Sequence, residues 1–363
     1  MIMKRNSKIA NIQFLLSILI VLIHANTTFM NLPGNELQYV FGLNVSTFVQ
    51  VFISEGLCRV AVPMFLCISG YLMFKTFDGS FKCYIGMLKK RFLSLIIPYL
   101  FWSSTVFFAF YFAQKIPALS AYFTTRNAGE LSLKTIFDDI IISSYNSPLW
   151  FCWYLIVFAL LSVVIYWIIK KAWFIALPIA FYGWFIGFPF SIGFRMDAVF
   201  FYLLGAFIAI HNNLILKIYS NIKKFEITFF VAFFILLIFN TYFLSKQQPL
   251  DVINGNYDLV SIYVQKTTFI VGCFAVWFGY DKIISSDASI LGASQYSFFI
   301  FVCHHPIVNV FKKLILKLTG VDVFTSLAVY FVSVIITVSL VIAAAALLKK
   351  VLPTIYKYIS GNR

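Results

Sequence analysis

The stretch IANIQFLLSILIVLIHANTTFM, residues 9–30, is apolar for long enough to cross a bilayer, which takes about 20 residues. It contains His24, and an imidazole inside a membrane helix is costly unless it faces a protein interior or a wet cavity. Helical geometry places Gln13, Ser17, His24 and Thr28 on one side, with Gln13 about 16 Å from His24 along the axis. This pattern predicts a membrane helix with a polar stripe, in which His24 is either functional or a packing residue bonded to a neighbouring helix.

The whole chain has the composition of a polytopic membrane protein. Of its 363 residues, 61% are hydrophobic and 11% are charged, which excludes an ordinary soluble domain of this size. A net charge of +15 would also suit a nucleic-acid partner, but the basic residues are scattered between apolar runs, so we expect no nucleic acid. The six cysteines fall mostly within apolar runs and show no CxxC or metal-ligand spacing. They predict buried thiols, without disulfides and without a metal site.

Repeated apolar runs predict an all-α, polytopic integral membrane protein of about ten transmembrane helices. The runs cover about 9–30, 57–75, 92–113, 149–169, 172–189, 196–211, 226–245, 259–280, 288–311 and 325–348. We expect a single membrane domain over residues 1–363, with no appended soluble domain. Two long outer segments follow, 31–56 and 114–148, and the helical spacing of LSLKTIFDDIIIS (131–143) in the second predicts an interfacial helix.

The distribution of lysine and arginine predicts the orientation. If both termini are cytoplasmic, basic residues in the inner segments outnumber those in the outer segments by about two to one, as the positive-inside rule requires. Lys312, Lys313 and Lys317 oppose this bias because they follow the ninth run on the outer side. The sequence therefore predicts a multi-pass protein with both termini in the cytoplasm.

With this orientation, several ionisable residues fall in the outer half of the bilayer. They are His24, Glu55, Arg59, Arg195, Asp197, Lys266, His304 and His305. Snorkelling or interfacial placement accounts best for Glu55 and Lys266. A shared polar cavity that opens outward explains the three histidines and Arg59 better.

Arg91 belongs to the other side of the predicted membrane. It ends the basic cluster Lys89–Arg91 at the cytoplasmic start of the third run. One interpretation is simple positive-inside anchoring. The other is that Arg91 binds phosphates of a ligand from the cytoplasm, since a guanidinium binds phosphate oxygens in a bidentate way.

Six segments, in the same order, resemble the membrane acyltransferase-3 family, which O-acylates sugars of bacterial envelope polysaccharides. They are IQFLLSILIVLIH (12–24), RVAVPMFLCISGYLMF (59–74), KKRFLSLIIPYLFW (89–102), PLWFCWYLIVFALL (148–161), FRMDAVFFYLLGAFI (194–208) and SQYSFFIFVCHHPI (294–307). The second segment is the most specific. The chain departs from the family pattern at Gln13, where arginine is usual, and at Pro148, where histidine is frequent. His304 matches the second histidine of the family, and His305 is additional.

The resemblance implies an acyltransferase of the bacterial inner membrane that moves an acyl group, with acetyl the first candidate, from cytoplasmic acetyl-CoA or another acyl-CoA. The acceptor would be a hydroxyl of an envelope or extracellular polysaccharide or of its lipid-linked precursor. Such a transfer needs a base for the hydroxyl proton and donors for the oxyanion, and neutral imidazole suits the first role. We expect His24 as the base and Arg91 as the acyl-CoA phosphate ligand. The expected substrate- or acyl-group-binding residues are Gln13, Arg59, Trp150 and His304.

Two other classes remain open from the residues alone. In a transporter or flippase of a lipid-linked glycan, buried histidines and arginines would line a path and do no chemistry. The sequence shows no inverted repeat, which such folds often contain. A glycan polymerase is the third possibility, and acyl transfer from acetyl-CoA by the purified protein separates the three classes. A covalent acyl-enzyme step also stays open.

Overall fold

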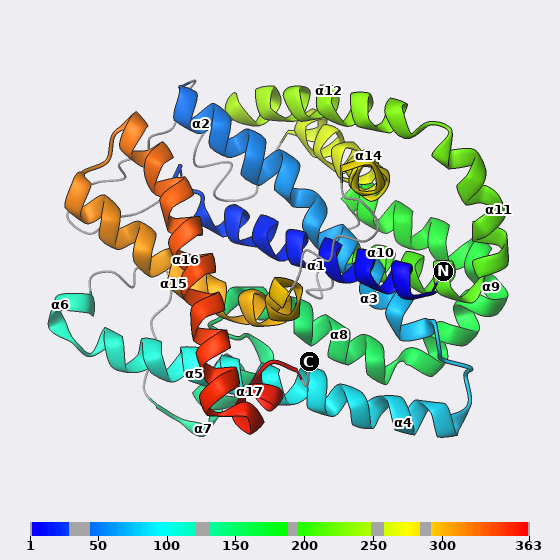
Figure 1. The fold of residues 1–363 in the computed structure, drawn as a ribbon, viewed down its shortest axis with the longest axis horizontal. Coiled ribbons are helices and arrows are strands. Elements are labelled where there is room, and N and C mark those ends of the chain that lie inside the picture. Colours follow the sequence, from blue (N-terminus) through cyan, green and yellow to red (C-terminus); the bar gives the residue numbers. More distant parts are fainter. Residues whose placement is uncertain are drawn as a thin grey trace.

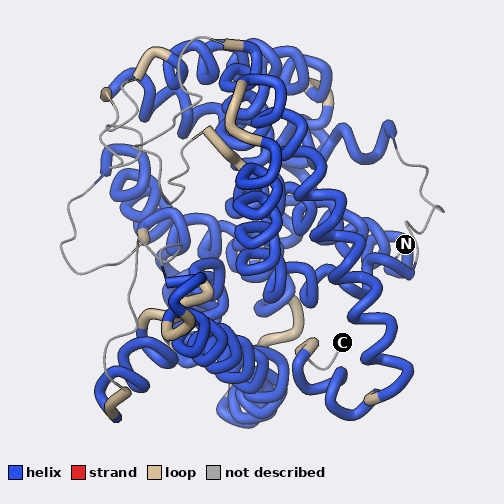
Figure 2. Tube along the Cα trace, turned by 90° about the vertical axis from the view of Figure 1, so that its left-hand side faces the viewer, coloured by secondary structure: helices blue, strands red, loops and turns tan. Residues whose placement is uncertain are grey.

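The computed structural model describes residues 2–28, 44–120, 131–187, 195–247, 258–283 and 292–361, which form helices and short loops without β-strands (Figure 2). Within these ranges eight helices are long and apolar enough to span a membrane. They are Ser7–Ala25, Val45–Phe74, Phe81–Gln114, Ser162–Ile186, Glu226–Ser245, Leu259–Lys282, Ser294–Thr319 and Val323–Val351. Two bent pairs, Leu133–Ile142 with Ser147–Leu160 and Met196–Ile210 with Asn212–Lys223, raise the number of candidate spans to as many as ten. The predicted all-α polytopic fold is confirmed.

Helix α1 (Ile2–Ala25) runs through the middle of the bundle (Figure 1). It packs against α3 (Ala61–Phe74), α15 (Ser297–Thr319) and α16 (Val323–Val351). Its polar residues therefore face protein. Ser17, for example, is fully buried and its hydroxyl donates 2.7 Å to a backbone carbonyl one turn back. The predicted inward polar stripe is confirmed over the helical residues.

The first helix ends at Ala25, earlier than predicted. Beyond it, polar side chains compete for the backbone and stop the helix. The Thr27 N–H donates to Gln50 Oε1 at 2.8 Å, and the Thr28 N–H donates to Asn26 Oδ1 at 2.8 Å. Thr28 therefore lies outside the helical stripe, and residues 29 and 30 of the quoted stretch lie outside the described residues.

The second span begins at Val45, so the prediction that an outer segment extends to residue 56 was wrong. It is built from α2 (Val45–Gln50), the π-helical turn η1 (Val51–Gly56), the 3-10 turn η2 (Leu57–Val60) and α3. Polar residues make this stretch look like a loop, but they bond to buried groups of α16. The Gln50 amide donates to Ser326 Oγ at 3.2 Å, and Ser54 shares a 2.9 Å hydrogen bond with Tyr330. Residues 31–43 of the predicted outer segment lie outside the described residues.

Helix α3 and helix α10 (Met196–Ile210) touch backbone to backbone. A Cβ added at Gly70 would lie 2.2 Å from the carbonyl oxygen of Tyr202, and one at Gly205 would lie 2.0 Å from that of Cys67. Neither distance is possible for a side-chain carbon. Glycine at both positions is thus what allows this pair of helices to approach.

The fourth and fifth predicted spans are divided differently in the structure. Helix α8 (Trp150–Leu160) ends at Leu161, inside the predicted span 149–169. Helix α9 (Ser162–Tyr182) carries non-helical backbone at Ala172, with φ −131° and ψ 25°, which is where the sequence predicts a new span. The predicted boundary therefore coincides with a kink, whereas the break at Leu161 has no sequence signal that we recognise.

The segment for which we predict an interfacial helix contains α7 (Leu133–Ile136) and the π-helical turn η4 (Phe137–Ile142). Its last carbonyls accept hydrogen bonds from α5 (Ile97–Gln114), through Ser103 at 2.7 Å and Tyr99 at 2.8 Å. The segment is therefore held against α5. Residues 121–130 of this predicted outer segment lie outside the described residues.

The remaining elements complete the bundle. They are α4 (Phe81–Arg91), η3 (Phe92–Ile96), α6 (Pro117–Ser120), η5 (Ser147–Leu149), η6 (Gly183–Gly187), α11 (Asn212–Lys223), α12 (Glu226–Ser245), α14 (Leu259–Ile283), η7 (Gly292–Tyr296) and α17 (Pro353–Ile359). All six cysteines are free thiols, of which three are buried and three are partly buried.

Candidate active site

Three histidines from two helices meet at the C-terminal end of α1. The ring centroid of His24 lies 5.2 Å from that of His304 and 4.8 Å from that of His305. The rings of His304 and His305 are 6.4 Å apart. His24 therefore points into the bundle, where the structure brings it together with His304. In the described part of the chain, no group of three His, Cys, Asp or Glu residues has a geometry that could hold a metal ion.

A proline fixes the turn of α15 that carries these histidines. Pro306 has no N–H, so it leaves the carbonyl of Val302 without its usual helical partner. The side-chain amide of Asn146, just before η5, donates to this carbonyl at 2.7 Å. This hydrogen bond satisfies the free carbonyl and connects the segment before α8 to the turn of α15 that carries the histidines.

The ring of His304 is fully buried and held in one orientation. Its Nδ1 lies 3.0 Å from the carbonyl oxygen of Ile300 and 2.7 Å from that of Phe301. Carbonyl oxygens only accept, so Nδ1 carries a hydrogen, and in the neutral ring Nε2 has a free lone pair. Nε2 is buried and has no hydrogen-bond partner among the described residues. His304 thus presents an unused acceptor beside His24.

His305 is bonded differently. The side-chain amide of Asn309, one turn further along α15, donates to His305 Nε2 at 3.1 Å. This ring nitrogen is already occupied, whereas the corresponding nitrogen of His304 is open. Both histidines face His24, but they are not equivalent.

Arg59 lies within electrostatic range of His24 and already has a carboxylate partner. Its Nε and Nη2 donate to the two oxygens of Glu55 at 2.9 and 2.8 Å. Glu55 is buried, with 9% of its surface exposed. The prediction that Glu55 snorkels was wrong, because the ion pair allows it to stay inside the bundle.

Lys312, which the sequence places after a span, lies inside the bundle. Its Nζ donates to the carbonyl oxygens of His24 at 2.8 Å and Asn26 at 3.2 Å, and the residue is 7% exposed. Sequence reasoning missed this residue. Its spacing was the available signal, since it follows His304 and His305 by about two helical turns and shares their side of α15.

Trp150 belongs to a second polar cluster, at the start of α8. The guanidinium of Arg195 stacks 3.9 Å from the Trp150 ring centroid and forms a 2.7 Å ion pair with Asp197. Lys266 lies apart from the histidines as well, because its Nζ donates to the carbonyls of Trp184 and Phe185 at 2.8 and 3.0 Å. Lys266 therefore closes a helix end and does not snorkel. Over the described residues, no ring contact joins Trp150 to the three histidines.

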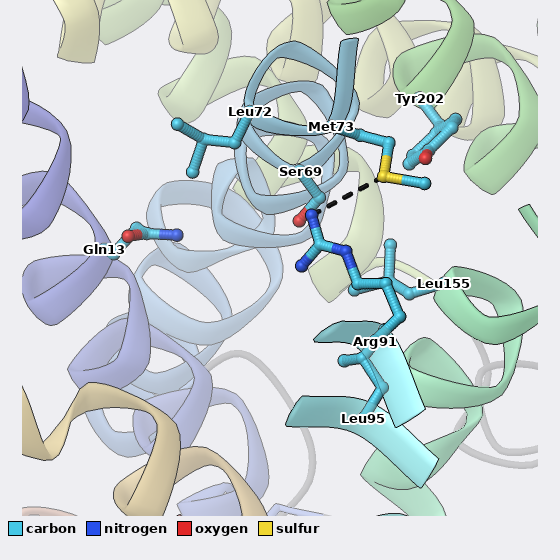
Figure 3. A pocket seen from close by; sticks show the side chains of 8 residues that line it. All are labelled: Gln13, Ser69, Leu72, Met73, Arg91, Leu95, Leu155 and Tyr202. Atoms are coloured by element: carbon cyan, nitrogen blue, oxygen red, sulfur yellow. Dashed lines mark hydrogen bonds between the residues drawn. The ribbon is translucent and has the colours of Figure 1, made fainter. Parts of the chain in front are cut away.

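A cavity of about 50 Å³ lies further towards the N-terminus of α1 (Figure 3). It is lined by Gln13, Ser69, Leu72, Met73, Arg91, Leu95, Leu155 and Tyr202. Gln13 extends towards it from α1, and Arg91 reaches it from the end of α4. The structure thus places Gln13 with Arg91 and not beside His24.

The guanidinium of Arg91 is bonded only weakly. Its Nη2 donates to the thioether sulfur of Met73 at 3.5 Å, and a thioether is a poor acceptor. Among the described residues, no carboxylate lies within ion-pair distance of Arg91. A partly buried cation beside a cavity, without a counter-ion, is suited to bind an anion.

Two sites are therefore placed along one helix. The histidines occupy the end of α1 at Ala25, and the Arg91 cavity opens next to Gln13. His24 follows Gln13 by eleven positions, which correspond to about 16 Å of helix. The family model described as "Acyltransferase domain" matches residues 6–346, which include all six segments quoted above. The chain belongs to the membrane acyltransferase-3 family.

This membership makes the protein a multi-pass membrane O-acyltransferase. The acyltransferase is also similar to the "Succinoglycan biosynthesis protein ExoH" of Rhizobium meliloti (strain 1021). The two sequences are 23% identical over 359 residues, which cover 98% of this chain and 93% of the relative. No solved structure matches the chain. Since the match extends over nearly the full length of both proteins, the acyltransferase and its relative share one domain plan.

Proposed function

We propose that the protein transfers an acyl group, acetyl in the first instance, from cytoplasmic acyl-CoA to a hydroxyl of an envelope or extracellular polysaccharide or of its lipid-linked precursor. The observation that carries this proposal is a basic site at His24 together with an anion site that Arg91 and Gln13 line, where Gln13 lies about 16 Å from His24 along α1. Acyl-CoA has the matching layout, because an extended pantetheine arm separates its phosphates from its thioester carbonyl.

At the histidine end, His24 acts as the general base. It takes the proton of the acceptor hydroxyl as the hydroxyl oxygen attacks the thioester carbonyl. The tetrahedral intermediate then collapses, the C–S bond breaks, and the CoA thiolate receives the proton from His24. Arg59 supplies positive charge near the developing oxyanion, and Glu55 holds it in place.

At the Arg91 end, the guanidinium holds phosphate oxygens of the donor. Replacing the weak thioether contact to Met73 by charge-assisted hydrogen bonds to phosphate favours binding. Gln13 and Ser69 line the same cavity and offer an amide and a hydroxyl to the same group. Gln13 therefore serves the donor phosphates in this proposal, instead of the acyl group.

The acceptor follows from chemistry and from the relative. A general base next to two further imidazoles suits a neutral hydroxyl nucleophile. The name of the relative refers to the biosynthesis of succinoglycan, which supports a glycan acceptor. Trp150 and Arg195, with an aromatic face and a guanidinium, form the candidate contact for that glycan.

We propose the inner membrane of a bacterium as the location, with both termini in the cytoplasm. The burial of Lys312 supports this orientation, because a lysine inside the bundle no longer counts as an outer loop charge. Reporter fusions at residue 363 and within residues 114–148 test it. A reporter in 114–148 that is active in the cytoplasm would reverse the orientation.

Donor and acceptor are tested together with purified protein. We expect acetyl-CoA, or another acyl-CoA in a panel, to release free CoA only when the glycan acceptor is present, and mass spectrometry to find the acyl group on the glycan. Envelope glycans from cells with and without the gene should differ by the same mass. Acyl transfer from a donor that lacks CoA, with none from acyl-CoA, would contradict the proposal.

A further inference from the structure

Lys312 bonds to the backbone of His24, the residue whose ring contacts His304 and His305. Its ammonium donates to the carbonyl oxygen of His24, in the last turn of α1, and to that of Asn26, just beyond it. The last carbonyls of a helix lack partners within the helix and carry partial negative charge, so a cation there is favourable. Helix α15 therefore holds His24 twice, through its ring and through its carbonyl.

A neutral donor would satisfy these carbonyls at lower cost. Lys312 is 7% exposed, and in the described part of the chain no carboxylate lies within ion-pair distance of it. Removing an ammonium from water without an opposite charge is expensive, and buried charges in membrane helices are commonly functional. The charge of Lys312 therefore needs an explanation beyond capping.

The groups that face His24 from each neighbouring element give that explanation. Helix α15 contributes His304, His305 and Lys312, and the turn η2 contributes Arg59, which is paired with Glu55 from η1. From α16, Tyr330 bonds to Ser54, whose hydroxyl also donates to a carbonyl of α1 at 2.9 Å. Among the described residues around His24, Lys312 is thus a positive charge without a compensating carboxylate.

We propose that Lys312 is a positioning residue that fixes the end of α1 and, by its positive charge, adds to the burial of His24 in disfavouring a proton on this ring, so that His24 is ready to accept one. The role of His24 as a base rests on the proposed function. The electrostatic effect of Lys312 on His24 does not, and it can be measured separately.

The test uses two neutral variants and two controls in the full-length protein. Lys312→Gln can still donate to a carbonyl but has no charge, and Lys312→Met has neither property. Lys312→Arg keeps the charge. Lys317→Met removes the same charge from an exposed position of the same helix.

The first readout is the rate of acyl transfer as a function of pH. In Lys312→Gln and Lys312→Met we expect the acidic limb of this profile, where the rate falls as pH falls, to move up by about one pH unit. The reason is that a cation close to the imidazole disfavours its protonation. At a given pH on the acidic side of that limb, their rates should be about tenfold below the wild-type rate. Lys312→Arg should keep the wild-type limb, and Lys317→Met should match the wild type throughout.

A second readout needs no activity. Diethylpyrocarbonate modifies neutral imidazole, so site-resolved mass spectrometry of His24, which is partly exposed, reports its neutral fraction at each pH. We expect the pH at which half of His24 is modified (the half-point) to be higher in Lys312→Gln than in the wild type. If this shift occurs while no protein transfers acyl groups from acyl-CoA, the proposed function fails and the inference about Lys312 holds. A Lys312→Gln protein that fails to insert, or that has the wild-type half-point, would overturn the inference, because Lys312 would then be only a structural cap.

Discussion

The stretch of α1 from Gln13 to His24 has cations at its two ends, and they are held differently. At the histidine end, Lys312 is held by two carbonyls and Arg59 by Glu55. At the Gln13 end, Arg91 has only the thioether of Met73 as a partner among the described residues, and it lies beside a cavity. A cation whose donors are used by the protein organises the protein itself, whereas a cation next to a cavity keeps its donors for a ligand. In the proposed function, the histidine end therefore carries the chemistry and the Arg91 end binds the donor.

The largest expected effect is at His24. His24→Ala should lower acyl transfer by roughly 10²–10⁴-fold, the usual contribution of a general base, without loss of protein from the membrane. His24→Gln should not restore activity, because an amide can form hydrogen bonds but cannot take the proton. Rates measured with equal amounts of inserted protein check this. Near-normal activity in His24→Gln would show that His24 is a packing residue and that the histidine end supplies no general base through it.

At the other end, Arg91→Ala should weaken acyl-CoA binding by about 1.5–3 kcal/mol, the contribution of a hydrogen bond to a charged group. Arg91→Lys should rescue it only partly, because lysine lacks the planar pair of donors. The exposed neighbour Lys90 provides the matched control, and Lys90→Ala should keep the wild-type affinity. Donor affinity measured by titration decides the outcome. An unchanged affinity in Arg91→Ala would return Arg91 to a membrane-anchoring role.

The glycine contact between α3 and α10 belongs to the binding end, since both helices line the Arg91 cavity. Gly205→Ala places a carbon 2.0 Å from the Cys67 carbonyl oxygen and should destabilise the protein by about 1–3 kcal/mol. Gly86→Ala meets nothing within 4 Å in α4 and should be tolerated. Thermal unfolding in detergent compares the two variants. Equal melting temperatures would show that α3 and α10 can separate without cost.

The smallest expected effect is the difference between His304 and His305, the two histidines next to His24. His304→Ala should lower the transfer rate about tenfold, as expected for the loss of one buried polar contact, and His305→Ala by less. The reason is that His304 Nε2 is open beside His24, whereas His305 Nε2 is already bonded to Asn309. Transfer rates of the two variants at one pH provide the check. A larger loss in His305→Ala would reverse their roles.

The fold was predictable where apolar runs are long and uninterrupted. It was not predictable at Val45–Gly56, because Gln50 and Ser54 look like loop residues until Ser326 and Tyr330 of α16 are placed against them. Local patterns show the polarity of a segment but not its partners. The start of the second span therefore needed the tertiary structure.

The candidate site shows the same limit. The polar stripe of α1 and the family motifs were enough to single out His24, His304 and Arg91. The sharing of one cavity by Gln13 and Arg91 depends on how α1 packs against α3 and α4, which spacing along the chain does not record. Lys312 was misplaced for a related reason, because its partners are backbone carbonyls of another helix and carry no sequence signature.

Steady-state kinetics of acyl transfer test the division between the two ends most directly. The wild type, His24→Gln and Arg91→Ala would be compared at varied acyl-CoA and saturating acceptor. A chemical end and a binding end predict that His24→Gln lowers kcat with little change in the donor KM, whereas Arg91→Ala raises the donor KM with little change in kcat. The reverse pattern, or the same change of both constants in the two variants, would contradict the assignment of chemistry to His24 and donor binding to Arg91.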